Sequence, residues 1–165
     1  MSTDWTTFKQ RIHISSPIEE LYKCWATPGG IMSWFLESAE YSSANVQRDD
    51  DEFIKKGDRF RWKWHNWDKI EKGTILEANG KDRLSFTFGK GGNVDVTLVK
   101  EGKGTWVELV QRDIPTDEES KMSYYMGCST GWTFWLTNLK AWLEHGISLN
   151  ITGLRQDQTA HLINS

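Results

Sequence analysis

Residues 59–65 read Arg-Phe-Arg-Trp-Lys-Trp-His and alternate without a break between polar and aromatic side chains. Phe60, Trp62 and Trp64 share one face of a strand with this period of two. The other face carries only polar side chains: Arg59, Arg61, Lys63 and His65. The stretch therefore predicts a strand whose aromatic face is buried and whose charged face meets water.

Further predicted strands lie on both sides of this stretch. Residues 7–14 alternate in the same way, with Phe8, Ile12 and Ile14 on one face. Residues 69–78 end at Asn79-Gly80, which is a strong hairpin signal. Three more alternating stretches follow, at 84–88, 94–98 and 105–112. Successive strands joined by short turns predict an antiparallel meander.

Two short helices are predicted between the first strand and the meander. Ser16-Pro17-Ile18-Glu19 has the residues of a capping box, in which Ser16 caps the helix and Glu19 reciprocates. Thr27-Pro28-Gly29-Gly30 predicts the end of this helix. The second short helix is expected to carry the apolar residues within 31–35.

A long helix is predicted over residues 120–145. Its apolar stripe and its C-cap are formed by Trp132, Leu136, Leu139, Leu143 and Gly146. We therefore predict an α+β fold with a curved antiparallel sheet of six to seven strands wrapped around this helix. One domain is expected over residues 1–146, followed by a C-terminal tail at 147–165.

The composition narrows the class of partner. The 165 residues carry a net charge of −3, which gives no reason to expect nucleic acid or an anionic membrane. No apolar run approaches the roughly 18 residues of a membrane span and no signal peptide is visible, so a cytoplasmic protein is expected. Ten tryptophans exceed what a core of this size needs, because each buries about 150–250 Å². Some must line a cavity, lie at an interface or stay half exposed.

Four motifs occur in order along the chain: 16–25 (Ser-Pro-Ile-Glu to Trp25), Trp34-Phe35, Lys56-Gly57-Asp58-Arg59-Phe60 with 73–77, and 104–109 with Gly131-Trp132. Together they resemble the START-like (SRPBCC) superfamily of the birch-pollen allergens, and within it the family named after the activator of the Hsp90 ATPase. The resemblance runs from about Phe8 to Leu143 and implies a helix-grip fold. That superfamily includes lipid carriers, cyclases and co-chaperones, so the resemblance implies no single function.

A cavity is predicted between the inner face of the sheet and the long helix, with Gly127 and Gly131 leaving room on the helix. Gln111 or Tyr125 would orient a ligand there. The predicted lining is Trp34, Phe35, Phe60, Trp62, Trp64, Phe86, Phe88, Val96, Leu109, Gln111, Tyr125, Cys128, Trp132, Trp135 and Leu136. The same residues also suit a filled aromatic core, and the sequence leaves both interpretations open.

Residues for covalent or metal chemistry are sparse. The four histidines lie on separate predicted elements, and no metal site or cofactor is expected. Cys24 and Cys128 are predicted to be buried free thiols, and no nucleophile motif is present. Glu71, Glu108 and Arg112 are expected to point outward, away from the cavity.

Three hypotheses for function follow. The favoured one is binding of a small apolar or aromatic ligand in the cavity without covalent chemistry. The alternative is a co-chaperone-like interaction domain acting on an Hsp90-type ATPase, and the third is an enzyme of the cyclase or dehydrase type. Trp106, which is expected on the outer face of the sheet, is a candidate surface for a partner or a homodimer.

Overall fold

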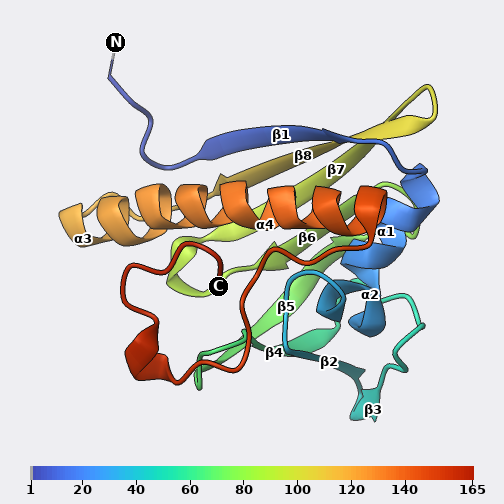
Figure 1. Ribbon diagram of the computed structural model, residues 1–165, viewed down its shortest axis with the longest axis horizontal. Helices are drawn as coiled ribbons and strands as arrows, with labels where there is room; N and C mark the ends of the chain where they lie inside the picture. Colours follow the sequence, from blue (N-terminus) through green and yellow to red (C-terminus); the bar gives the residue numbers. More distant parts are fainter. Residues whose placement is uncertain (1) are drawn as a thin grey trace.

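A computed structural model describes residues 2–165 as a curved antiparallel sheet with a long helix lying across one face (Figure 1). The strands are β1 (Phe8–Ile14), β2 (Ser38–Ser43), β3 (Val46–Gln47), β4 (Arg59–Lys63), β5 (Ile70–Ala78), β6 (Arg83–Thr87), β7 (Asn93–Glu101) and β8 (Gly104–Arg112). The helices are α1 (Ile18–Ala26), α2 (Pro28–Met32), α3 (Glu118–Ser120) and α4 (Gly127–His145), with short turns η1 (Gly89–Gly91), η2 (Lys121–Met126) and η3 (Gln156–Gln158).

The strands pair in the order β1-β8-β7-β6-β5-β4-β2-β3, and every pair is antiparallel. The predicted α+β helix-grip fold is confirmed, but the sheet has eight strands instead of six to seven. The two-residue β3 explains the difference. A period of two from about residue 38 predicts β2, in which Ala39 and Tyr41 are buried, but both residues of β3 are exposed and show no alternation. Pairing with β2 makes β3 a strand.

The short helices begin differently from the prediction. The N-cap residue of α1 is Pro17 and no side chain caps it, so the predicted capping box of Ser16 and Glu19 is wrong. The Ser16 carbonyl instead accepts a hydrogen bond from Thr105 Oγ1 at 2.9 Å. Helix α2 spans 28–32 instead of 31–35, because Thr27 Oγ1 caps the Gly30 N–H at 2.9 Å.

The predicted long helix is confirmed, although its first turns are irregular. α3, η2 and α4 follow one another without a break from Glu118 to His145. η2 is π-helical, and its wider turn changes which side chains face the sheet. Beyond it Trp132 is buried as predicted, and Gly146 ends the helix with a φ of +67°.

An aromatic cluster joins the long helix to the sheet. The ring of Phe35 stacks on Trp132 with centroids 5.2 Å apart, and it also stacks on Trp34 with centroids 5.1 Å apart. Three buried indole N–H groups donate hydrogen bonds, each 3.0 Å long. The acceptors are the Cys24 carbonyl for Trp34, the Tyr41 hydroxyl for Trp62 and Gln111 Oε1 for Trp132. Several of the ten tryptophans therefore form a filled, hydrogen-bonded core.

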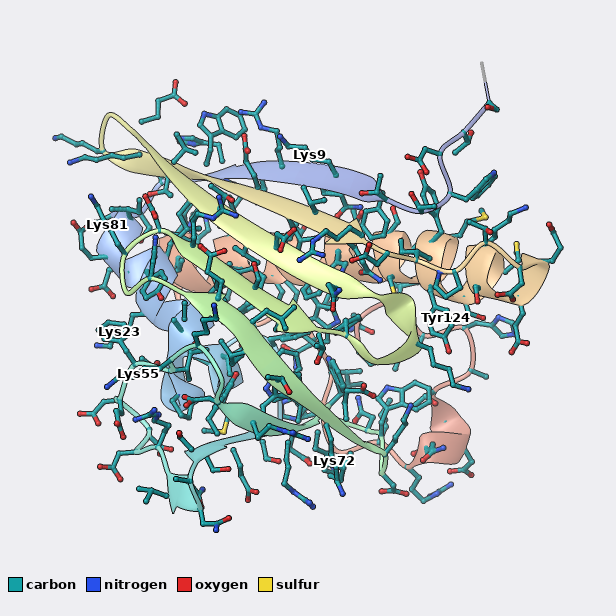
Figure 2. The ribbon with its side chains drawn as sticks, turned by 180° about the vertical axis from the view of Figure 1, so that it is seen from behind. Lys9, Lys23, Lys55, Lys72, Lys81 and Tyr124 are labelled. Carbon is teal, nitrogen blue, oxygen red and sulfur yellow. The ribbon has the colours of Figure 1, made fainter. Side chains whose placement is uncertain are left out.

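The opposite face of the sheet is charged, and Figure 2 shows it in front of α4. There Glu108 pairs with Lys9 at 3.2 Å and with Arg11 at 3.0 Å. Trp106 lies on the same face but is partly covered, since the Arg11 guanidinium carbon lies 4.5 Å from its ring centroid and His13 packs edge-on at 5.2 Å. A partner or homodimer surface at Trp106 stays a prediction.

Asp58 ties the loop before β4 to the sheet. Its side chain is 1% exposed and accepts hydrogen bonds from Arg48 Nε, Arg48 Nη2 and the Lys55 N–H, each at 2.9 Å. Burial alone would raise the pKa of Asp58, but these hydrogen bonds outweigh it and hold the pKa below its usual value. Arg48 also pairs with Glu52 at 2.6 Å.

We expect Asp58→Asn to lower the free energy of unfolding at neutral pH by about 3 kcal/mol, because Arg48 then loses its buried partner. The folded-state pKa of Asp58 lies below the unfolded value of about 3.9. The stabilisation that ionised Asp58 contributes is therefore complete above the unfolded-state pKa, and it is lost as the pH falls through the folded-state pKa. Urea unfolding in neutral and acidic buffer measures this difference. The exposed Asp51→Asn is the control, and an equal acid sensitivity of wild type and Asp58→Asn would contradict the assignment.

Candidate functional site

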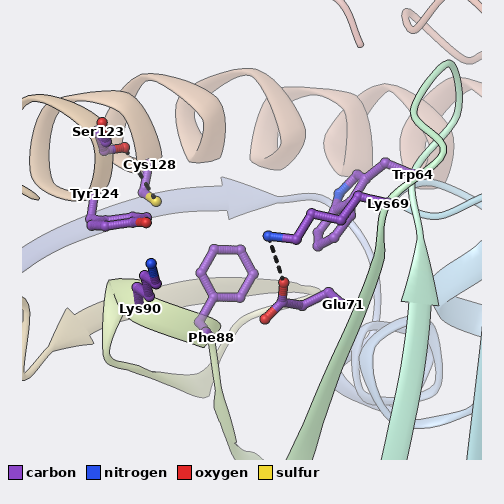
Figure 3. Close-up of a pocket in the computed structure, with 9 residues that line it drawn as sticks. Trp64, Lys69, Glu71, Phe88, Lys90, Ser123, Tyr124 and Cys128 are labelled. Atoms are coloured by element: carbon purple, nitrogen blue, oxygen red, sulfur yellow. Dashed lines mark hydrogen bonds and ion pairs between the residues drawn. The ribbon is translucent and has the colours of Figure 1, made fainter. Parts of the chain in front are cut away.

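A cleft of about 570 Å³ opens between the inner face of the sheet and the first half of α4. It is lined by Phe35, Trp64, Trp67, Phe88, Ser123, Gly127, Cys128, Gly131, Trp132 and Trp135. We call it the aromatic cleft. A second space of about 390 Å³, the polar hollow, is lined by Trp64, Lys69, Glu71, Phe88, Gly89, Lys90, Ser123, Tyr124 and Cys128 (Figure 3). The two spaces share four lining residues, so they lie next to each other and together make up the candidate site.

The aromatic cleft follows from two local patterns. Trp64 and Phe88 continue the inward-facing alternation of β4 and β6 just beyond the last residue of each strand. On the helix, Gly127 and Gly131 are four residues apart and so lie on one side. A Cβ added at Gly131 would meet no atom within 4 Å, and one at Gly127 would meet only the Met122 carbonyl at 3.4 Å. The cleft is open on the helix side because these two positions lack side chains.

The polar hollow brings together charged groups that the sequence did not predict to meet. Glu71 was expected to point outward, and this is wrong. It pairs with the inward-facing Trp62 across β4 and β5, and directly opposed residues share a face. Lys69 Nζ lies 3.6 Å from Glu71 Oε2, and Figure 3 shows this ion pair beside Phe88. Lys90 lies farther along the hollow, below Tyr124.

The thiols in and near the site are poor nucleophiles. Burial raises the pKa of the Cys128 thiol above its usual value, so the thiol is protonated at neutral pH. Burial raises the pKa of Cys24 to about 11. Within residues 2–165, no group of three His, Cys, Asp or Glu side chains is placed to hold a metal ion. No helix in the same range is long and apolar enough to cross a membrane.

Apart from Tyr125, the residues predicted to line the cavity divide into two groups. Those that line the aromatic cleft are Phe35, Trp64, Phe88, Cys128, Trp132 and Trp135. Those packed in the buried core away from both spaces are Trp34, Phe60, Trp62, Phe86, Val96, Leu109, Gln111 and Leu136. The two interpretations that the sequence left open, a cavity and a filled core, thus describe different parts of the same interface.

Gln111 is not free to hold a ligand. Its side chain is fully buried, its Nε2 donates to the Gly91 carbonyl at 2.9 Å, and its Oε1 accepts from Trp132 Nε1 at 3.0 Å. Both ends of the amide therefore have partners, and Gln111 fixes the orientation of the Trp132 ring at the edge of the cleft.

Tyr125 does not line the site either. Its ring packs edge-on against Trp5, with centroids 4.9 Å apart, and the neighbouring Tyr124 lines the polar hollow instead. The π-helical η2 lies at this point, and an apolar repeat does not reveal such a turn. Sequence reasoning also missed Lys69 and Lys90, because turn lysines usually look like ordinary solvated residues.

Residues 147–165 pack against the body of the protein beside the aromatic cleft. Asn138 of α4 is fully buried, donates to the Trp34 carbonyl at 2.6 Å and accepts from the Leu149 N–H at 2.7 Å. Asn66 donates to the Ile151 carbonyl at 3.0 Å and accepts a further hydrogen bond from the segment. Two asparagine side chains thus fasten the C-terminal segment, which Figure 1 shows looping beneath α4.

Comparison with known proteins gives a family and a fold. The family model described as "Activator of Hsp90 ATPase homolog 1-like protein" matches residues 15–144. No curated protein sequence matches the chain significantly.

Three solved structures with the same fold are 16–19% identical to this chain. Protein SSP2350 from Staphylococcus saprophyticus has a TM-score of 0.69 at 19% identity, and the match covers 87% of this chain and 95% of SSP2350. The Aha1 dimer from Colwellia psychrerythraea has a TM-score of 0.64 at 16% identity, and the match covers 85% of this chain and 97% of the Aha1 chain. CalU16 from Micromonospora echinospora has a TM-score of 0.61 at 19% identity, and the match covers 85% of this chain and 77% of CalU16. At this identity the likeness shows the fold alone.

We expect Asn138→Leu to detach the C-terminal segment and to lower the free energy of unfolding by about 3 kcal/mol. The substitution leaves the Trp34 carbonyl and the Leu149 N–H without their partner. Hydrogen exchange should show faster exchange at Leu149 and the residues after it. Thr137→Val, at an exposed neighbouring position, is the matched control. Unchanged exchange in the segment would show that Asn138 does not hold it.

Proposed function

The chain belongs to the family of Activator of Hsp90 ATPase homolog 1-like proteins, and we propose that it binds a small apolar or aromatic molecule in the aromatic cleft, without covalent chemistry. The observation that carries this proposal is an open space of about 570 Å³ with aromatic rings on several sides and two glycines on the helix side. Ligand sites commonly have about 300–1,000 Å³ and largely apolar walls.

The energetics of the aromatic cleft favour an apolar occupant. Trp67 is 38% exposed and Trp64 is half-buried, so a ligand between them removes apolar surface from water. Trp132 and Phe35 are fixed by packing and, for Trp132, by the hydrogen bond to Gln111. Rings that are already ordered lose little conformational entropy when they contact a ligand.

Two other functions remain candidates, each with one favouring observation. The family match favours a co-chaperone-like interaction with an Hsp90-type ATPase. Glu71, a carboxylate on the inner face of the sheet, favours a cyclase or dehydrase type of enzyme. A change in the ATPase rate of a cognate chaperone would support the first, and turnover that is lost in Glu71→Gln would support the second.

We expect Gly131→Leu to reduce binding of the neutral dye N-phenylnaphthylamine at least tenfold, because the leucine side chain occupies the space that the dye requires. The dye fluoresces more strongly in apolar surroundings, so titration of its fluorescence measures the affinity. Replacing a helical glycine also stabilises the helix by about 0.8–1 kcal/mol, so the variant should unfold no more easily than wild type.

The matched control is Thr130→Leu, which adds the same side chain at an exposed position of α4 outside the cleft. It should leave the affinity for the dye unchanged. If Gly131→Leu and wild type bound the dye equally well, binding in the aromatic cleft would be ruled out.

A further inference from the structure

The two adjoining spaces differ in chemistry. The aromatic cleft is lined by rings, two glycines and the small side chains of Ser123 and Cys128. The polar hollow adds two ammonium groups, one carboxylate and one phenol, from Lys69, Lys90, Glu71 and Tyr124. A molecule that fills both spaces must therefore have an apolar body and a polar end.

The charges in the polar hollow do not cancel. Glu71 is the only carboxylate among the lining residues of the two spaces, and Lys69 already pairs with it at 3.6 Å. Lys90 has no ion-pair partner among the residues that line the hollow, as Figure 3 shows. The lining residues of the hollow therefore carry one uncompensated positive charge, although the whole chain is negative.

The orientation of the groups favours an anion over a cation. Glu71 is only 17% exposed and is directed against the η1 turn, where a Cβ on Gly89 would come within 2.5 Å of Glu71 Oε1. That carboxylate is thus covered mainly by the turn, since its partner Lys69 is itself 84% exposed. Lys90 and Tyr124 both line the hollow, and both can donate a hydrogen bond to an anionic group.

Building on the proposed ligand binding, we propose that the natural ligand is an amphipathic anion. Its aromatic or aliphatic body lies in the aromatic cleft between Trp64, Phe88 and Trp132. Its single negative group, a carboxylate, sulfonate or phosphate, lies in the polar hollow and is bound by Lys90 with Tyr124 as a second donor. The four shared lining residues place the two spaces next to each other, and the proposed ligand extends across that boundary.

Two dyes with the same apolar body test this proposal. Anilinonaphthalene sulfonate carries one sulfonate, and N-phenylnaphthylamine is its neutral parent. Lys90→Met removes the ammonium but keeps a side chain of similar length. We expect it to weaken binding of the sulfonate dye about tenfold, the size of one charge-assisted hydrogen bond, and to leave the neutral dye unchanged. Added salt should weaken only the sulfonate dye.

Lys81→Met is the matched control, because it removes the same charge from an exposed turn distant from the site, as Figure 2 shows. It should change neither affinity. The anion inference would be overturned, while ligand binding stood, if Lys90→Met weakened the binding of both dyes equally or of neither dye. The same holds if Lys81→Met weakened the binding of the sulfonate dye as much as Lys90→Met does. If Gly131→Leu left the binding of both dyes unchanged, the proposed function itself would fail and the inference with it.

Discussion

The hydrogen bond from Trp132 Nε1 to Gln111 Oε1 joins the long helix to the C-terminal end of β8, and the aromatic rings of the interior are arranged around it. Gln111 lies on the inner face of β8, and its other amide end holds the Gly91 carbonyl of the η1 turn. Phe35 stacks on the Trp132 ring, and the ring centroid of Phe88, just after β6, lies 5.6 Å from that of Trp132. One polar pair therefore sets the position of the helix, the η1 turn and the rings at the edge of the cleft.

This arrangement explains why the helix covers a filled core and an open cleft at the same time. On the C-terminal side of Trp132, Leu136 and Leu139 pack into the core. On the N-terminal side, Gly131 and Gly127 present no side chain, so the same helix face leaves space above Trp64. The helix passes over the sheet on both sides of Trp132. The cleft lies on the N-terminal side because the residues there are glycines, whereas leucines fill the interface on the C-terminal side.

The sequence predicted the elements whose side chains repeat with a clear period and missed those that depend on contacts elsewhere. The alternation at 59–65 and the stripe from Trp132 to Leu143 fixed β4 and α4, because burial of one face imposes such patterns. The two-residue β3 could not be predicted, since both of its residues are exposed and only pairing with β2 makes it a strand. The π-helical η2 was invisible in the apolar spacing, and so Tyr125 was chosen where Tyr124 lines the site. Glu71 was misassigned because its face follows from pairing with Trp62, which only the register reveals.

Core and site share Phe35, Trp132 and Trp135, but the charged groups of the site lie outside the core. Residues that hold the fold without lining either space, such as Gln111 and Asp58, are buried. The residues that distinguish the site, Trp67 and Lys90, lie in turns at strand ends. A change in a turn lysine alters the charge of the hollow without removing a core contact. Structures below 25% identity can therefore share this sheet and helix without sharing the charged residues of the hollow. The proposed preference for an anionic ligand rests on the polar hollow and not on the shared fold.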